Sequence, residues 1–357
     1  MSRSLASLLA RLPRVEIHLH LEGSVQLRRL RTFWQRPGRD PALPSDPAAL
    51  FRHRSFPEFL RHFALVTQAI RTPADLAAIT SDLCRSLARQ GIVAAEVFFS
   101  PVIFTRRGLP FGEMMDSIQE SAVASERAGG PSVAWILDGV RQWGTAGLEE
   151  LLDCARMARG RVLGIGMGGD ERSVPARAFS DLFAEARRMG LMTVAHAGEF
   201  DSARSVREAV EILGAERIGH GIRATEDREV LRLLKRRRIP LEVCPTSNLR
   251  TGVVRRWKDH PLTDLIRSGL RVTLNSDDPA LFRTSLSSEY AAAHRRLGIK
   301  PDALFRIHLE AIAASRLPPA EKRRLRLRSR EIWGKRSALR PDGGRSPGGA
   351  PKGPARA

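Results

Sequence analysis

Two histidines separated by one residue stand near the end of the first apolar run, residues 15–21. Strand side chains alternate between two faces, so His18 and His20 would point the same way and Leu19 the other way. Imidazole nitrogens are common Zn²⁺ ligands, so the pair could form half of a metal site. Two core histidines with purely structural roles remain the alternative at this point.

Three later apolar runs also end in side chains suited to metal or acid–base chemistry. His196 and Glu199 close the fifth run, His220 closes the sixth, and Asp277 and Asp278 close the eighth. Two buried, ionised aspartates would repel each other, and a cation coordinated by one of them removes that repulsion. Each group alone could be a core histidine, a helix cap or a turn residue. Together, the four strand ends predict side chains that converge on one metal site.

These residues belong to a repeating pattern of elements. Eight short β-type runs recur along the chain, and segments with helical spacing lie between them. Strands that alternate with helices predict parallel βαβ units, and eight units in about 250 residues predict an α/β fold, a (β/α)₈ TIM barrel. Functional groups of such barrels lie at the carboxyl ends of the strands. The expected strands are 15–21, 93–100, 132–138, 162–167, 192–197, 217–221, 239–245 and 271–277.

Two segments fall outside this repeat. Residues 22–92 are too long for one crossover helix and contain a proline-rich linker, 40–47, and an aromatic helical segment, 51–66. Phe56 and Phe59 would lie on its apolar face, either packing on the barrel or forming a hydrophobic lid over a pocket. We expect one barrel domain over 1–334 with this lid insertion, and a disordered basic tail over 335–357.

Composition narrows the class of protein. The 357 residues are 42% hydrophobic and 27% charged, as in globular proteins, and no apolar run approaches the ~18–20 residues of a membrane span. Cys84, Cys154 and Cys244 lie far apart, which predicts a reducing compartment, the cytoplasm. The net charge of +20 raises the alternative of a basic nucleic-acid-binding barrel without catalysis. Arginines spread over most elements favour an ordinary basic surface.

Five blocks resemble the signature motifs of the adenosine deaminase family of metal-dependent hydrolases. They occur in the family's order within residues 13–282: PRVEIHLHLEGS, TVAHAGE, ERIGHGIRA, LEVCPTSNLRTG and VTLNSDDPALF. The resemblance implies a TIM barrel with one catalytic zinc at its mouth. The cytidine-deaminase type of zinc site is not supported, because Cys244 is followed by Pro245 and no second cysteine.

The same resemblance implies the metal ligands and the acid–base pair. Related barrel hydrolases with two metals commonly bridge them with a modified lysine, and no lysine precedes Lys235, so we expect one zinc per chain. A hydrolase of another substrate, such as a cyclic amide, is disfavoured for the same reason and by the Asp-Asp pair. The implied zinc ligands are His18, His20, His196 and Asp277, with Glu199 as the acid that protonates purine N1 and His220 as the base for the attacking water.

The resemblance also implies a purine site. Asp278 matches the residue that contacts N7, Gly169 matches the backbone contact to N3, and Phe56–Phe63 resembles a hydrophobic gate over the base. The reaction expected is hydrolytic deamination of the 6-amino group of an adenosine-type nucleoside, with release of ammonia.

The substrate is less narrowly defined than the reaction. CPTSNLRTG matches the nucleoside branch of the family, which disfavours free adenine. Glu22 replaces an aspartate that lies near the ribose 5′-hydroxyl in typical adenosine deaminases. WILDGVRQWG and GIGMGGDE resemble the bacterial branch that acts on 6-amino-6-deoxyfutalosine, an adenosine extended at its 5′ carbon by an aromatic carboxylate in a menaquinone pathway. We expect this substrate ahead of adenosine, with 5′-methylthioadenosine as a further alternative.

Overall fold

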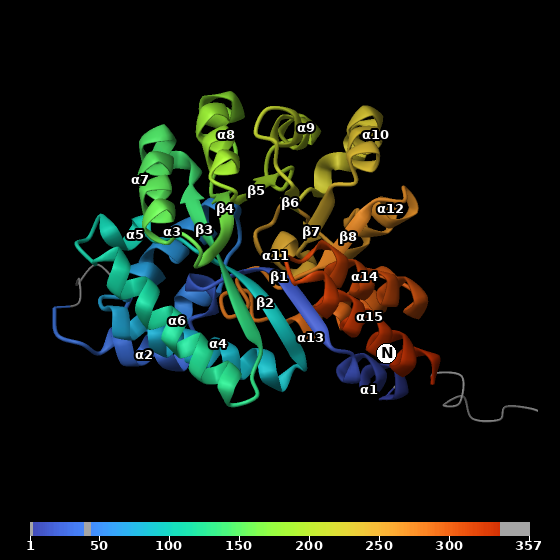
Figure 1. Ribbon diagram of the computed structural model, residues 1–357, viewed down its shortest axis with the longest axis horizontal. Coiled ribbons are helices and arrows are strands. Elements are labelled where there is room, and N and C mark those ends of the chain that lie inside the picture. The colour runs from blue at the N-terminus through green and yellow to red at the C-terminus, as the bar shows by residue number, and fades with distance from the viewer. Residues whose placement is uncertain (1–2, 39–43, 336–357) are drawn as a thin grey trace, which may run out of the picture.

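The computed structural model describes residues 3–38 and 44–335, and in it eight strands form a nearly closed parallel barrel (Figure 1). Neighbouring strands follow the chain order from first to last, and a parallel bridge between Leu19 and Asp277 joins the last strand to the first. The predicted TIM barrel is therefore confirmed. The strands are β1 (Arg14–His20), β2 (Ile92–Phe99), β3 (Ser132–Val140), β4 (Val162–Gly168), β5 (Met192–Ala197), β6 (Arg217–His220), β7 (Pro240–Val243) and β8 (Arg271–Leu274).

All eight strands lie where the apolar runs predicted them, but five end one to three residues earlier than expected, the first two of them at His20 and Phe99. The sixth, seventh and eighth runs were predicted to reach residues 221, 245 and 277, whereas the strands end at His220, Val243 and Leu274. The chain bends at these points: His220 and Asp277 have φ of 61° and 63°, and Pro245 begins the next helix. The polar residues after the strands thus lie on turns rather than on regular strand.

Helices surround the strands, as the alternating pattern predicted (Figure 1). The predicted helical stretches 73–91 and 227–238 contain α4 and α10, and the stretch 205–216 overlaps α9, which begins two residues earlier. Local signals fix their ends: Thr72 and Asp75 form a capping box at the start of α4, and Asp227 caps α10. The helices are α1 (Arg3–Arg11), α2 (Leu27–Trp34), α3 (Phe56–Gln68), α4 (Pro73–Arg89), α5 (Val102–Thr105), α6 (Phe111–Arg127), α7 (Gly144–Met157), α8 (Ser180–Arg188), α9 (Ala203–Glu211), α10 (Arg228–Arg237), α11 (Pro245–Arg250), α12 (Leu262–Arg267), α13 (Leu286–Leu297), α14 (Pro301–Ala314) and α15 (Pro319–Gly334).

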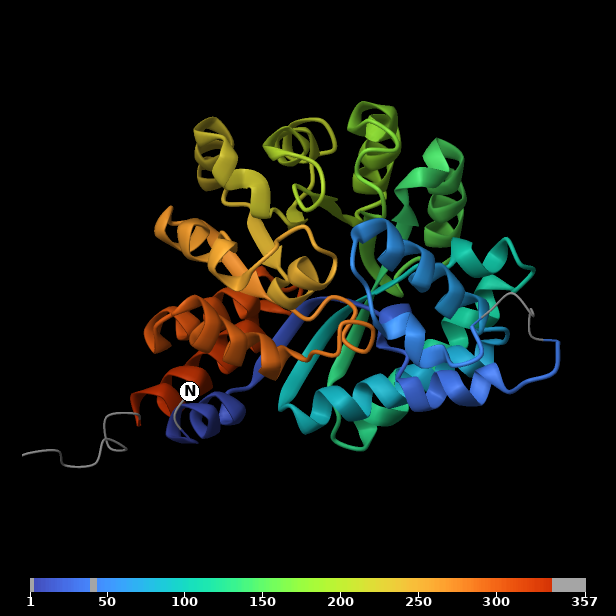
Figure 2. The same cartoon turned by 180° about the vertical axis from the view of Figure 1, so that it is seen from behind.

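The insertion after β1 is helical and includes α2, α3 and α4. Figure 2 shows the blue helices α2 and α3 in front of the strands, on one side of the barrel, whereas α4 is cyan. Phe56 of α3 stacks on Phe200, which follows β5, with ring centroids 4.7 Å apart. Phe59 lies 4.8 Å from Phe282, which follows β8. The aromatic face of α3 is therefore attached to the loops that leave the barrel.

Two expectations extend beyond the described part of the chain. Residues 336–357 of the predicted tail and 39–43 around the proline-rich linker lie outside it. Among the described residues, no helix has the length and apolar character needed to cross a membrane.

Candidate active site

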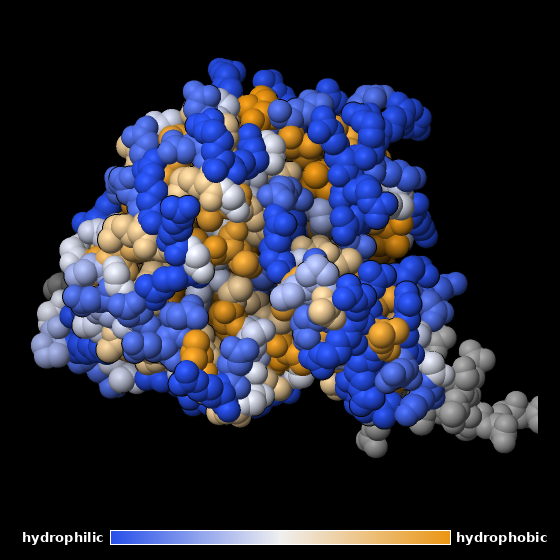
Figure 3. Space-filling view, viewed as in Figure 1, coloured by the Kyte–Doolittle hydropathy of each residue, from blue (hydrophilic) through white to orange (hydrophobic). Residues whose placement is uncertain are grey.

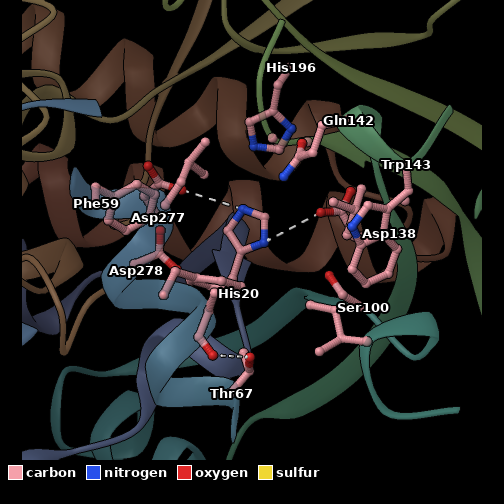
Figure 4. A pocket seen from close by; sticks show the side chains of 18 of the residues that line it. His20, Phe59, Thr67, Ser100, Asp138, Gln142, Trp143, His196, Asp277 and Asp278 are labelled. Carbon is pink, nitrogen blue, oxygen red and sulfur yellow. Dashed lines mark hydrogen bonds and ion pairs between the residues drawn. The ribbon is translucent and has the colours of Figure 1, made fainter. Parts of the chain in front are cut away.

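A cavity of about 380 Å³ opens where the strands end. Its wall combines the buried polar residues of the strand ends with the aromatic face of α3. Figure 4 shows His20 between Asp277 and Asp138, with its ring nitrogens 3.4 Å and 3.8 Å from the two carboxylates. The cavity gathers nine of the sequence-predicted site residues: His20, Phe56, Phe59, Gly169, His196, Glu199, His220, Asp277 and Asp278.

Four buried side chains form a group able to hold a metal ion. One ligand atom from each of His18, His196, His220 and Asp277 lies within 4.8 Å of all the others. His18 Nε2 is buried, has no hydrogen-bond partner in the described structure and lies 3.5 Å from Asp277 Oδ1. An orphaned imidazole nitrogen facing a carboxylate suits a divalent cation. The group contains His220 instead of the predicted ligand His20. His20 lies beside the group, with its Nε2 atom 3.4 Å from Asp277 Oδ1, the oxygen that also faces His18.

Hydrogen bonds to the distal ring nitrogens orient two of these histidines. Glu242 Oε2 lies 2.7 Å from His18 Nδ1, and the carbonyl oxygen of Met167 lies 3.2 Å from His196 Nδ1. Both contacts leave the Nε2 atoms available as ligands. Such partners fix the tautomer and ring orientation of metal-binding histidines. Glu242 is itself held by Arg217, whose Nε lies 2.5 Å from its other oxygen.

His220 and Glu199 lie together against Asn248. The Nδ2 atom of Asn248 is 3.1 Å from His220 Nδ1 and 3.4 Å from Glu199 Oε1, and His220 Nε2 is 3.5 Å from Glu199 Oε2. Burial lowers the pKa of His220 well below 6.5, so its imidazole is neutral at pH 7. Burial, followed by the neighbouring carboxylates of Asp277 and Glu171, raises the pKa of Glu199 well above 4.5. The two shifts therefore favour a neutral imidazole beside a protonated carboxyl group.

The loop that carries Glu199 is fixed by a second carboxylate. Glu171 accepts hydrogen bonds from the backbone N–H groups of Gly198, Glu199 and Phe200, at 2.7–2.8 Å, and from the Ser205 hydroxyl. These bonds satisfy the donors of a buried turn and position the Glu199 side chain.

The two adjacent aspartates have opposite electrostatic properties. Burial alone would raise the pKa of Asp277, but His220 and His18 outweigh burial and hold it below its usual range. Burial and the nearby Asp277 raise the pKa of Asp278 well above 3.8. The opposite shifts reduce the predicted repulsion, because they favour ionisation of Asp277 and protonation of Asp278.

Asp278 also depends on a glycine. A Cβ atom added to Gly23, just after β1, would lie 1.7 Å from Asp278 Oδ1, so only glycine leaves room for this carboxyl group. Asp278 Oδ1 is buried and has no hydrogen-bond partner among the described residues, although it lines the cavity.

The remaining predicted positions divide into two groups. Gly169 lines the cavity with φ of 95°, and Phe56 and Phe59 line it from α3. Glu22 is buried and does not line the cavity; its carboxylate accepts a hydrogen bond from the backbone N–H of Ser100, which does. Any influence of Glu22 on a ligand would therefore be indirect, through Ser100 or through the charge that raises the pKa of the lining residues Asp138 and Asp278.

Sequence reasoning missed several residues that shape the site. Asn248 was read only as part of a motif, and no role was expected for Glu242 or Asp138. A carboxylate inside an otherwise apolar strand run, as in PLEV and ILDG, was the available signal, because buried carboxylates need a specific partner. Arg106, Arg107 and Trp143 also line the cavity. The Arg106 guanidinium lies over the Trp143 ring, 4.4 Å from its centroid.

Comparison with known proteins places this geometry in a family. The adenosine deaminase family model matches residues 13–331. An aminodeoxyfutalosine deaminase from Streptomyces coelicolor is 39% identical over 90% of this chain and 85% of its own length. The crystal structure of an adenine deaminase from Arthrobacter aurescens is 29% identical and covers 91% of this chain and 99% of its own, with a TM-score of 0.86. An amidohydrolase structure from Burkholderia ambifaria with bound Zn has a TM-score of 0.87 at 24% identity, covering 95% and 96%. The chain belongs to the adenosine deaminase family and is a hydrolytic deaminase.

Proposed function

We propose that this chain is a zinc-dependent deaminase of an adenosine extended at its 5′ carbon, with 6-amino-6-deoxyfutalosine as the substrate. The observation that carries the proposal is one continuous cavity. It runs from the buried histidine and carboxylate cluster, past the aromatic face of α3, to Trp143, Arg106 and Arg107. The Streptomyces relative named for this activity supports the same choice.

His18, His196 and Asp277 would hold the zinc ion, with His20 as the fourth ligand implied by the family motif. When bound, zinc supplies a water nucleophile at neutral pH, because it can lower the pKa of coordinated water to about 7. The orphaned His18 Nε2 atom and the low pKa of Asp277 suit this cation. The bound Zn of the Burkholderia structure agrees with the choice of metal.

The acid–base pair would carry the protons. His220, neutral at pH 7, takes a proton from the water that attacks C6 of the purine. Glu199, protonated by virtue of its raised pKa, donates to N1, where the electrons of the broken C6–N1 double bond collect. Proton transfer to the 6-amino group then lets ammonia leave. Asp278 would face N7, and Gly169 would offer its backbone to N3.

The aromatic and cationic part of the cavity would hold the 5′ extension. An aromatic carboxylate combines an apolar ring with a negative charge, and this wall offers Phe63, Ile103 and Trp143 beside Arg106 and Arg107. Free adenine would leave this part of the cavity empty. A substrate that fills it gains apolar burial in addition to the contacts of the base.

A substrate panel tests the proposal. We would measure ammonia release and the ultraviolet change from adenine to hypoxanthine with aminodeoxyfutalosine, adenosine, 5′-methylthioadenosine and adenine. The expected order places aminodeoxyfutalosine first in kcat/KM. A preference for adenine would contradict the assignment of substrate, and no turnover of any of the four would contradict adenine-type deamination altogether.

A further inference from the structure

A second cavity, of about 320 Å³, lies at the opposite end of the barrel from the candidate active site. Met192, Arg217, Pro240 and Arg271, the first residues of β5, β6, β7 and β8, line it together with the end of α14. Glu216 is the one acidic residue in its lining. Six of its lining residues are cationic: Arg217, Arg237, Arg238, Arg271, Arg316 and Lys322.

Carboxylates neutralise only part of this charge. Arg217 pairs with Glu96 and Glu242, each at 2.5 Å. Arg271 pairs with Glu310, and Arg316 pairs with Glu216. Six cations against four carboxylates leave two positive charges without a counter-ion in the described structure.

Two of the six lining cations have a structural role at the end of a helix. Lys322 Nζ donates to the carbonyl oxygen of Ala313 and Arg217 Nη1 to that of Ala314, so both neutralise the carboxyl end of α14. Arg237 and Arg238, at the end of α10, form no ion pair with any described residue. Figure 3 shows predominantly hydrophilic side chains over the surface that carries α10, α14 and α15.

One lining residue, Arg217, also has a buried donor without a partner. The Arg217 side chain is 3% exposed, and its Nη2 atom has no hydrogen-bond partner among the described residues. A buried guanidinium N–H left unpaired is costly unless a ligand or water accepts it. The pKa of Lys322 reflects the many positive charges around it. Burial lowers this pKa, Arg316, Arg217 and Arg271 lower it further, and Glu96 has the opposite effect.

We propose that this cavity is a binding site for a phosphate group, with Arg237 and Arg238 as its principal donors. A dianionic phosphate matches the two uncompensated charges, and its oxygens accept the forked hydrogen bonds that guanidinium groups donate. The volume of about 320 Å³ admits free phosphate or a small phosphoester. This site is separate from the proposed catalytic function and does not depend on it.

Calorimetric titration of inorganic phosphate and of glycerol 3-phosphate into the metal-loaded protein, at constant ionic strength set with chloride, tests the site. Arg237→Gln is the test variant, because it removes one lining cation that has no partner in the described structure. Arg236→Gln is the matched control: Arg236 is exposed on the same helix, forms no ion pair with a described residue and does not line the cavity.

We expect one saturable phosphate site per chain, a dissociation constant raised about tenfold by Arg237→Gln and a change below about twofold in Arg236→Gln. Tighter binding of glycerol 3-phosphate would identify a phosphoester rather than free phosphate as the preferred ligand. Equal losses of phosphate affinity in the two variants would show only non-specific attraction of the anion to a basic surface. That result, or phosphate binding unchanged by Arg237→Gln, would overturn the proposal.

Discussion

Replacing Glu199 with glutamine keeps the shape of the side chain and removes its transferable proton. Because general acid catalysis contributes about 10²–10⁴-fold, we expect kcat to fall by a factor in that range. Steady-state kinetics with the best substrate of the panel provides the measurement, and metal analysis of the same sample shows whether the site is otherwise intact. Glu113→Gln makes the same chemical change at an exposed position on α6 and should leave kcat unaltered. Full turnover by Glu199→Gln with its metal retained would eliminate Glu199 as the acid.

Glu242 offers a second test at the residue scale, through the metal rather than the substrate. Its carboxylate lies between His18 Nδ1 and the Arg217 guanidinium, in a fully buried position. Glu242→Gln replaces one carboxylate oxygen by an NH₂ group, which cannot accept a hydrogen bond. The side chain can then no longer accept from both His18 and Arg217, so His18 loses its fixed orientation. We expect zinc affinity to fall about 10–100-fold, measured by competition with a chromophoric chelator. Glu310→Gln, which breaks the ion pair with Arg271, should not change the zinc affinity. Equal zinc affinities in the wild type and both variants would refute the role of Glu242.

Individual residues were predictable where a motif and a strand end coincide. The shared direction of His18 and His20 follows from strand periodicity, and Asp277 is marked by its position at the end of a predicted apolar run. Glu242 and Asn248 carry no such local signal, because each acquires its role from a partner more than 25 residues away: Glu242 from His18 and Asn248 from His220. Because these partners lie far apart in the sequence, local patterns do not reveal their contact, which forms only in the folded barrel.

At the scale of elements, α3 should control access to the cavity through its aromatic face. Phe56 is buried, lines the cavity and stacks on Phe200, so Phe56→Ala removes both a wall and an attachment of the helix. We expect KM to rise about tenfold with a smaller change in kcat, since an aromatic pair contributes about 0.5–1.5 kcal/mol beyond the area it buries.

The matched control for α3 is Phe305→Ala on α14. Phe305→Ala also removes a ring stack, because the centroids of Phe305 and Trp333 lie 4.5 Å apart, but Phe305 does not line the cavity. A rise in KM common to both variants would indicate general loosening of the fold and would contradict a specific role for α3.

The order of the elements was more predictable than their ends. Apolar β-type runs separated by amphipathic stretches, together with the right-handed crossover rule, predict a barrel with the strands in chain order, as observed. The ends of β6, β7 and β8 were not predictable to the residue. At His220 and Asp277 the backbone adopts positive φ, a conformation disfavoured for non-glycine residues and upheld here by the surrounding contacts.

At the scale of the whole molecule, buried carboxylates should make stability depend on pH. Glu289 on α13 is fully buried, accepts a hydrogen bond from the backbone N–H of Thr246 at 3.0 Å and also contacts the Thr284 hydroxyl. Burial raises the pKa of Glu289 to about 7, against 4.5 for the ordinary side chain. Between these two values the folded protein binds more protons than the unfolded chain, so the contribution of Glu289 to the free energy of unfolding falls as pH rises.

Glu289→Gln removes this titration while its amide can still accept from Thr246 and donate to Thr284. The stability of the variant relative to wild type should therefore increase by about 1–3 kcal/mol from pH 5 to pH 8, since each pKa unit corresponds to ~1.4 kcal/mol. Urea unfolding of both metal-loaded proteins at a series of pH values measures this difference. Taking the difference cancels the buried histidines, such as His308, whose lowered pKa acts in the opposite direction in both proteins. A difference that stays constant with pH would show that Glu289 is already ionised in the folded barrel.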